Sequence, residues 1–433
     1  MSRSLTADPW LVPYREKFRQ RGRHTDAMEL RLTGGAPLAE FASAHHYFGL
    51  HRTETGWVFR EWAPNAESIY LIGTFSDWLP SDSFRLKRLN PAGHWEIALA
   101  GECLAHGDLY RLHVAWPGGA GDRIPAYARR VVQDPQTLIF NAQVWAPPEP
   151  HAWEFNGPQS SFEPPLIYEA HIGMAQEKEG IGTYDEFRTK VLPLIHDGGY
   201  NTLQLMAIME HPYYASFGYH VSSFFAVSSR FGTPEEFKRL VDAAHGLGIR
   251  VIIDLIHSHA VCNEVEGLSR FDGTDHQYFH GGARGWHPAW ESRCFDYGKP
   301  EVLHFLLSNC RFWIDEYRVD GFRLDGITSM LYKHHGLSKA FTTYDDYFDD
   351  TVDDDALAYL TLANDLVHTL RREAITVAED VSGMPGLSAP RAEGGCGFDY
   401  RLAMGTPDCW FTLAKDVSDE KWSMDYLWHE LTN

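Results

Sequence analysis

Two different spacings of apolar residues divide the chain. Between residues 46 and 150, short apolar runs such as GWVFREWAP, SIYLIGTF and DLYRLHVAW alternate with Gly, Pro, Asn and Asp. Short strands separated by turns are typical of an all-β sandwich. After a proline-rich stretch, strands alternate with helices. The pattern therefore predicts an N-terminal helical segment at 1–45, a sandwich at 46–150, a linker at 151–165 and a second domain at 166–433.

The second domain contains six apolar segments with strand character, at 166–173, 201–208, 250–256, 319–325, 374–380 and 397–403. The helix that begins at Thr233 has the strongest signals, because Pro234 suits a first helical turn and Glu236 completes a capping box with Thr233. Strands that alternate with helices predict a parallel sheet with crossover connections. Both a doubly wound sheet and a (β/α)8 barrel fit this pattern.

The fourth of these strands, VDGFRLD, carries the first candidate chemistry. Side chains alternate between the two faces of a strand, so Arg323 and Asp325 point the same way. A neighbouring arginine favours the ionised carboxylate, and an ionised aspartate at a strand end is a candidate nucleophile. A structural Arg–Asp pair in a buried loop is the alternative.

Polar residues follow three neighbouring strands: Asp254, His257, His259, Arg323, Asp325 and Glu379. Barrel enzymes place their catalytic residues at the carboxyl ends of the strands. Two carboxylates on adjacent strands suit glycoside chemistry, in which Asp325 attacks the anomeric carbon. Glu379, kept protonated by partial burial, donates a proton to the leaving oxygen. A retaining mechanism requires the two carboxyl groups to lie about 5–5.5 Å apart.

Two other polar clusters could suggest metal sites, but each has a simpler structural explanation. The triplet HSH at 257–259 could bind zinc, but two histidines need further ligands and no cysteine nearby has ligand spacing. The acidic run DDYFDDTVDDD at 345–355 lacks the Asp–Gly register of a calcium loop. We expect a solvated acidic loop there and no metal site.

Composition narrows the class of protein. The net charge of −21 argues against binding to nucleic acid, whose phosphates require a basic surface. Aromatic residues reach 14%, and their flat faces suit sugar rings, although most buried aromatics serve the core. The six cysteines have no C-x-x-C spacing, which indicates reduced thiols. With neither a signal peptide nor an 18-residue apolar run, we expect a soluble cytoplasmic protein without a membrane partner.

Several longer motifs carry a family resemblance: LIYEAHIGMAQEKEGIGTYDEF, DLIHSHA, DGFRLDGITSMLY, ITVAEDVSGMP and GFDYRLAMG. From about residue 45 onward the chain resembles the 1,4-α-glucan (glycogen and starch) branching enzymes, in the eukaryote-type subfamily of the α-amylase superfamily. The resemblance implies an α/β TIM-type barrel preceded by a glycogen-binding-like, immunoglobulin-like sandwich. It also implies an α-glucan partner, a monomer, and transfer of a glucan chain to a 6-hydroxyl without metal or cofactor. A hydrolase of the same superfamily and a non-catalytic glucan-binding protein remain alternatives.

The resemblance also implies individual roles. Asp325 matches the family nucleophile and Glu379 its acid/base. The implied substrate-binding residues are Tyr219, Asp254, His259, Arg323, Trp62, Pro64 and Trp95. Two positions depart from the family pattern, since His220 stands where glutamine is common and Ser258 where amylases usually carry asparagine.

One family motif has no match in the chain: a His–Asp pair after a seventh strand, whose carboxylate stabilises the oxocarbenium-like transition state. The sequence ends with DYLWHELTN after the sixth predicted strand. We therefore expect a barrel truncated after about six strands, with two exposed strand edges. Because a missing electrostatic group costs several kcal/mol of barrier, we also expect an inactive, C-terminally truncated fragment of a branching enzyme.

Overall fold

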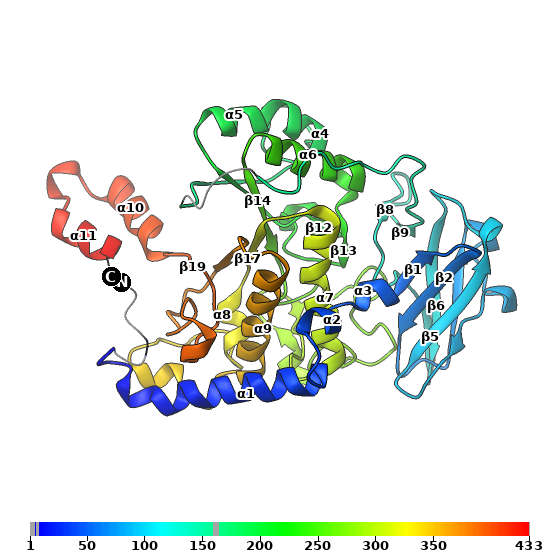
Figure 1. The fold of residues 1–433 in the computed structure, drawn as a ribbon, viewed down its shortest axis with the longest axis horizontal. Helices are drawn as coiled ribbons and strands as arrows, with labels where there is room; N and C mark the ends of the chain where they lie inside the picture. Colours follow the sequence, from blue (N-terminus) through cyan, green and yellow to red (C-terminus); the bar gives the residue numbers. More distant parts are fainter. Residues whose placement is uncertain (1–4, 6–7, 159–163, 433) are drawn as a thin grey trace.

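The first domain of the fold is an all-β sandwich, as the sequence predicts (Figure 1). The computed structural model describes residues 5, 8–158 and 164–432. One antiparallel sheet has the order β1-β2-β5-β4, with strands β1 (Gly49–Arg52), β2 (Gly56–Trp62), β5 (His94–Ala100) and β4 (Lys87–Arg88). The other has the order β3-β6-β9-β8, and β7 pairs with β6: β3 (Ser68–Gly73), β6 (Leu109–Trp116), β9 (Phe140–Gln143), β8 (Val131–Gln133) and β7 (Gly119–Arg123). Inward-facing side chains such as Phe59, Leu71 and Leu112 form its core.

The second domain is built on six parallel strands, and each lies in a segment that the sequence predicts as a strand. They are β10 (Ile167–Ala170), β11 (Thr202–Leu205), β14 (Arg250–Leu255), β17 (Gly321–Leu324), β18 (Ile375–Ala378) and β19 (Tyr400–Arg401). Their order in the sheet is their order in the chain. A doubly wound sheet reverses its strand order at a switch point, whereas a barrel adds each strand on the same side. The sheet is therefore of the barrel type, and within the described residues β10 and β19 are its edges.

Helices connect these strands. They are α4 (Tyr184–Glu186), a π-helical turn (Phe187–Val191), α5 (Leu192–Asp197), α6 (Pro234–Gly246), α7 (Pro300–Tyr317), α8 (Ile327–Leu331) and α9 (Asp354–Leu370). The loops also contain two short hairpins, β12 (Met209–Glu210) with β13 (Ser223–Val227) and β15 (Trp286–His287) with β16 (Ser292–Arg293). The predicted capping box at α6 is present, with the Glu236 amide 3.2 Å from Thr233 Oγ1. In the part of the chain that the structure describes, no helix combines the length and apolarity needed to cross a membrane.

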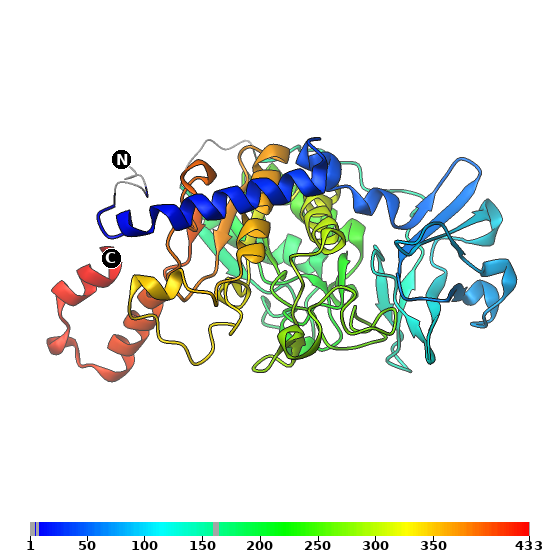
Figure 2. The same ribbon diagram turned by 90° about the horizontal axis from the view of Figure 1, so that it is seen from below.

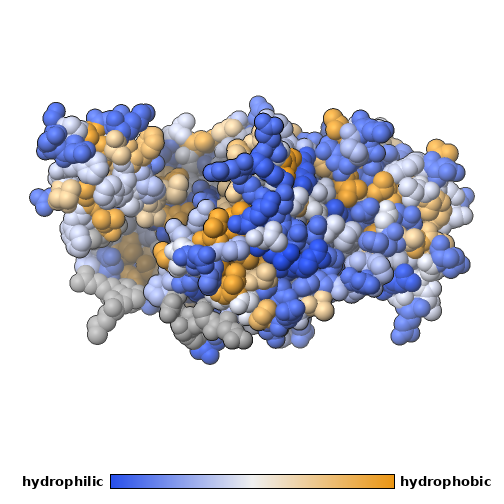
Figure 3. Space-filling view, turned by 90° about the horizontal axis from the view of Figure 1, so that it is seen from above, coloured by the Kyte–Doolittle hydropathy of each residue, from blue (hydrophilic) through white to orange (hydrophobic). Residues whose placement is uncertain are grey.

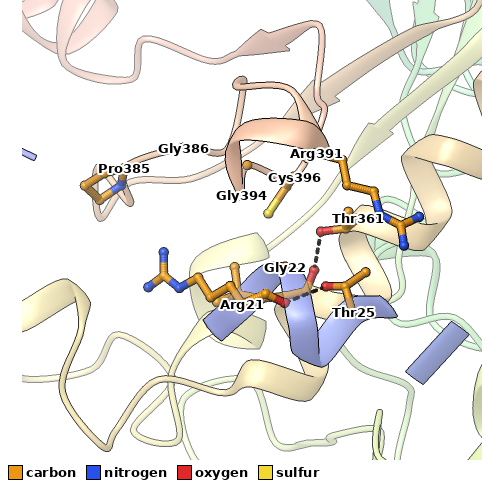
Figure 4. Close-up of a pocket in the computed structure, with 11 residues that line it drawn as sticks. Arg21, Gly22, Thr25, Thr361, Pro385, Gly386, Arg391, Gly394 and Cys396 are labelled. Carbon is orange, nitrogen blue, oxygen red and sulfur yellow. Dashed lines mark hydrogen bonds between the residues drawn. The ribbon is translucent and has the colours of Figure 1, made fainter. Parts of the chain in front are cut away.

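The N-terminal helix α1 (Arg15–Thr33) packs along the barrel rather than standing apart. Figures 1 and 2 show it beside α9. Its Phe18 is only 2% exposed and contacts Phe348 edge to face. Figure 4 shows Arg21 and Thr25 of α1 facing the loop that carries Gly394 and Cys396. The short helices α2 (Leu38–Phe41) and α3 (Ala44–Tyr47) then lead into β1.

The proline-rich stretch at 151–165 is held against the barrel in the portion that the structure describes. The amide of His151 donates to Glu235, and the amides of Glu154 and Phe155 donate to Asp242, both carboxylates belonging to α6. Residues 159–163 lie outside the described residues. The described part of the segment is therefore fixed to α6 by hydrogen bonds, which its composition did not indicate.

The last two helices form a separate small layer. The helices α10 (Gly405–Asp416) and α11 (Met424–Thr432) pack on each other through Cys409, Leu413 and Leu427, a cluster distinct from the main core. Large apolar side chains on these helices are exposed: Trp410, Phe411, Met424, Tyr426, Trp428 and Leu431. Figure 3 shows hydrophobic surface at this end of the molecule, on its left.

Candidate active site

Three neighbouring strands bring the candidate catalytic residues together. In the register of the sheet, Asp254 of β14 lies opposite Arg323 of β17, and Arg323 lies opposite Val377 of β18. Asp325 follows β17 and Glu379 follows β18. Because parallel strands end at the same edge of a sheet, all four polar side chains meet there, as the sequence predicts.

Arg323 is the centre of this cluster. Its Nη1 lies 2.9 Å from Asp254 Oδ2 and 2.7 Å from Asp325 Oδ1, and its Nη2 lies 3.0 Å from Glu379 Oε1. The residue is only 7% exposed. A planar guanidinium presents its donors in a rigid fork, so one buried cation fixes three carboxylates from three strands.

Asp254 is fully buried and has two further partners. Gln204 Nε2 donates to its Oδ1 at 2.9 Å, and the Tyr219 hydroxyl donates to its Oδ2 at 2.7 Å. Burial raises the pKa of Asp254 to about 8, although Arg323 and Tyr219 lower it. Asp254 is therefore a fixed hydrogen-bond acceptor at the centre of the site.

Asp325 and Glu379 influence each other's pKa. Burial raises the pKa of Asp325, whereas its ion pair with Arg323 and a hydrogen bond to Glu379 lower it. Burial also raises the pKa of Glu379, and the charge of Asp325 and the same hydrogen bond raise it further, against the influence of Arg323. A proton shared between the two carboxyl groups is thus favoured on Glu379. The expectation that Arg323 determines the charge of Asp325 was incomplete, because burial opposes the arginine and the net direction is upward.

A tight turn holds Glu379 in place. The amide of Gly326 donates to Glu379 Oε2 at 2.8 Å, and the amide of Ile327 donates to its main-chain oxygen at 3.1 Å. Gly326 has φ +64°, and a Cβ there would lie 2.9 Å from Ser258 Oγ and 3.0 Å from Trp290. Only glycine meets both conditions without strain.

The two histidines of the HSH triplet have different environments. Both ring nitrogens of His257 are hydrogen-bonded, to Tyr359 and Asn309, so neither is free to bind a metal ion. His259 is buried with Nδ1 3.0 Å from Ser258 Oγ, and burial lowers its pKa to about 3. His259 is therefore a neutral side chain next to the cluster.

The acidic run at 345–355 has structural partners. Asp346 pairs with Lys339 at 2.7 Å, and Asp353 accepts hydrogen bonds from the first amides of α9. No metal-ligand cluster occurs in this run among the residues that the structure describes. These acidic side chains therefore serve a local ion pair and the cap of α9.

The tryptophans predicted to contact glucan are mostly buried. Trp95 is 4% exposed and its Nε1 donates to the Ala63 carbonyl, so no ring face is available for a sugar. Trp62 is 7% exposed and donates to the Ala92 carbonyl. Together with the half-buried Pro64, it lines a cavity of about 520 Å³ between sandwich and barrel. Trp95 thus serves the sandwich core, whereas a role of Trp62 and Pro64 in glucan binding stays a prediction.

Sequence reasoning missed three neighbours of the cluster. Gln204 is the one amide side chain in the buried strand TLQL, a signal that was available. Gly326 is recognisable only from its backbone angle. The Trp290 ring stacks on that of His287, with 3.9 Å between the ring centroids, and its centroid lies 4.8 Å from that of His259. Nothing in the local sequence of Trp290 indicates this position.

Comparisons with known proteins agree with this geometry. Residues 47–135 match the family model of carbohydrate-binding module 48 (isoamylase N-terminal domain), and residues 176–293 match the catalytic domain of alpha amylase. A "1,4-alpha-glucan-branching enzyme" of Dictyostelium discoideum is 48% identical over 434 residues, covering 98% of this chain and 63% of the relative. Another from Equus caballus is 45% identical over 444 residues, covering 100% and 63%. The chain thus spans less than two thirds of the length of these curated relatives.

Solved structures share the fold at low sequence identity. The pullulanase SAP of GBS, in complex with maltotetraose, aligns with a TM-score of 0.62 and 16% identity over 84% of this chain and 48% of that chain. The catalytic module of the glycogen-degrading pneumococcal virulence factor SpuA aligns with a TM-score of 0.59 and 16% identity over 79% and 52%. At this identity the likeness concerns the fold alone.

Proposed function

We propose that this chain, across the length that it spans, belongs to the family of 1,4-α-glucan-branching enzymes. On this premise the whole protein cleaves α-1,4 bonds of a glucan and transfers the chain to a 6-hydroxyl. The observation that carries the proposal is the guanidinium of Arg323, which holds Asp325 at 2.7 Å and Glu379 at 3.0 Å. The two carboxyl groups also share a side-chain hydrogen bond, which fits the short spacing of a retaining pair, whereas an inverting pair needs room for a water molecule between them.

The first half-reaction uses the two carboxyl groups in different protonation states. Asp325 attacks the anomeric carbon, and the bond from that carbon to the 4-oxygen of the leaving chain breaks. Glu379 gives its proton to this oxygen, and a covalent glucosyl ester of Asp325 forms. The higher proton affinity of Glu379 in the pair supports this division of roles.

The second half-reaction reverses these transfers with a different acceptor. Glu379, now a base, takes the proton of a 6-hydroxyl as its oxygen attacks the anomeric carbon. Asp325 leaves, and the product keeps the α configuration in an α-1,6 branch. Tyr219, Asp254 and His259 are the side chains that we propose to contact the glucose unit at the cleaved bond.

The partner and the compartment follow from the same proposal. A neutral α-glucan suits a protein with a net charge of −21, which disfavours nucleic acid. All six cysteines are free, which suits a reducing, cytoplasmic compartment. We propose a cytoplasmic monomer for the whole protein.

The test compares two readouts of the protein expressed from the complete reading frame that contains this sequence. Branching of amylose lowers its iodine colour without a matching release of reducing ends. We expect Asp325→Asn and Glu379→Gln each to lower the rate at which the iodine colour is lost by about 10⁴-fold or more. Asp185→Asn, which changes an exposed carboxylate paired with Arg188, is the matched control and retains full activity.

Three results would overturn the proposal. Reducing ends that appear in step with the loss of colour identify a hydrolase. An Asp325→Asn protein that folds and keeps more than a tenth of the activity excludes Asp325 as the nucleophile. Colour loss that is absent from the wild-type protein, together with retained glucan binding, favours the non-catalytic alternative.

A further inference from the structure

A cluster of metal-ligating side chains lies far in sequence from the catalytic strands. It forms where the short helix α3 meets α7, a contact that includes a hydrogen bond from the Ala44 amide to Ser308 Oγ at 2.8 Å. His45, His46 and Asp315 each offer one ligand atom there, and these atoms all lie within 4.8 Å of one another. Two imidazoles and a carboxylate form a donor set that transition metals bind.

The environment of His45 points independently to a ligand. The side chain is only 3% exposed, and neither of its ring nitrogens has a hydrogen-bond partner among the described residues. Buried polar atoms are rarely left unsatisfied, because the loss of hydration is not repaid. Its ring lies 4.0 Å from that of His46 and belongs to the cluster that includes Asp315.

The charged groups around the cluster allow it to bind a cation with moderate affinity. Arg311 Nε donates a hydrogen bond to Asp315 Oδ2 at 2.8 Å, which leaves the other carboxylate oxygen for a metal ion. The positive charges of Arg129 and Arg311 act on His45 and oppose a further cation. The affinity should therefore be well below that of a closed structural zinc site.

We propose that His45, His46 and Asp315 form a binding site for a divalent transition-metal ion of the zinc, nickel or cobalt type, which links α3 to α7. Metal–ligand bonds of about 2.0–2.2 Å place tetrahedral donors about 3.4 Å apart. His46 and Asp315 are exposed, and small rotations of their side chains close the remaining gap. Magnesium and calcium prefer oxygen ligands and do not fit two imidazoles.

The position of the site gives the metal a structural role. The helix α3 precedes the first strand of the sandwich, and α7 leads into β17, which carries Arg323. A metal bound between them fixes the start of the sandwich to the helix that positions the catalytic strand. Because the ion binds only the folded protein, it stabilises that state by mass action.

The experiment is a titration of the untagged chain with ZnCl₂, and separately with NiCl₂, after treatment with EDTA and its removal. We expect one ion to bind per chain, with a dissociation constant in the micromolar range by calorimetry. Saturating zinc should raise the melting temperature by a few degrees. His46→Gln and Asp315→Asn, both at exposed positions, should each weaken binding by at least tenfold and abolish the rise in melting temperature.

The control is His24→Gln. His24 is also an exposed histidine in contact with a carboxylate, 2.8 Å from Asp355, but it lies outside the cluster. We expect wild-type zinc binding from this variant. The absence of saturable binding up to millimolar zinc, or equal weakening by His24→Gln and His46→Gln, would overturn the proposal.

Discussion

Replacing Arg323 by leucine removes the cation that three buried carboxylates share. Asp254, Asp325 and Glu379 lie within 2.7–3.0 Å of its guanidinium, and in each of them Arg323 lowers the pKa against the effect of burial. Without it, these carboxyl groups bind protons more tightly in the folded protein than they already do. The substitution therefore destabilises the fold in a manner that depends on pH.

The magnitude follows from removing one partner of a buried ion pair, which typically costs about 3–5 kcal/mol. A carboxyl group whose pKa is raised on folding contributes stability below its unfolded pKa, near 4, and loses it as the pH rises through its folded pKa. Because the loss of Arg323 raises all three pKa values further, the destabilisation should be small near pH 4 and should grow towards that range as the pH rises to about 8 and above.

Urea denaturation of the 433-residue chain, followed by tryptophan fluorescence at several pH values, measures this difference. The matched control is Arg188→Leu, which breaks a half-exposed ion pair with Asp185 at 2.7 Å and should cost less than about 1 kcal/mol at every pH. A destabilisation by Arg323→Leu that stays below about 1 kcal/mol, or that does not change between pH 5 and 8, refutes the argument.

Two further substitutions test other parts of the fold. Glu61 is fully buried, and burial raises its pKa from 4.5 to about 8, although hydrogen bonds from the Trp62 and Ala126 amides lower it. The free energy of unfolding should therefore fall as the pH rises from about 4.5 to 8, by at most about 5 kcal/mol. Glu61→Gln should flatten the measured dependence of unfolding free energy on pH, and an unchanged slope would contradict this. Phe18→Ala should weaken the packing of α1 on the barrel by about 3–5 kcal/mol. Proteases should then cleave α1 faster while the barrel stays intact, and a cleavage rate equal to that of the wild type would contradict this prediction.

Much of the architecture could be predicted from local patterns. The six parallel strands lie in the six predicted segments, and the capping box at Thr233 forms as its sequence indicates. Asp325 and Glu379 could be paired in advance because both follow strands that are neighbours in a barrel. In each case the signal is carried by residues close in sequence, since periodicity and capping are local properties.

Other features of the site depended on neighbours that are remote in sequence. Residue type alone did not distinguish a sugar platform from a core residue, and packing decided that Trp95 is buried. Likewise, the HSH triplet does not reveal that the ring nitrogens of His257 are bonded to Tyr359 of α9 and Asn309 of α7.

The sequence by itself determined which elements form, in what order, and which acidic residues end neighbouring strands. Only the tertiary structure decided how strongly those acids hold their protons, because burial and the position of Arg323 act through space. It also decided where α3 meets α7 and places His45 beside Asp315, 270 positions apart. The physical reason is that hydrophobic periodicity is encoded locally, whereas desolvation and charge interactions depend on every group that packs around a site.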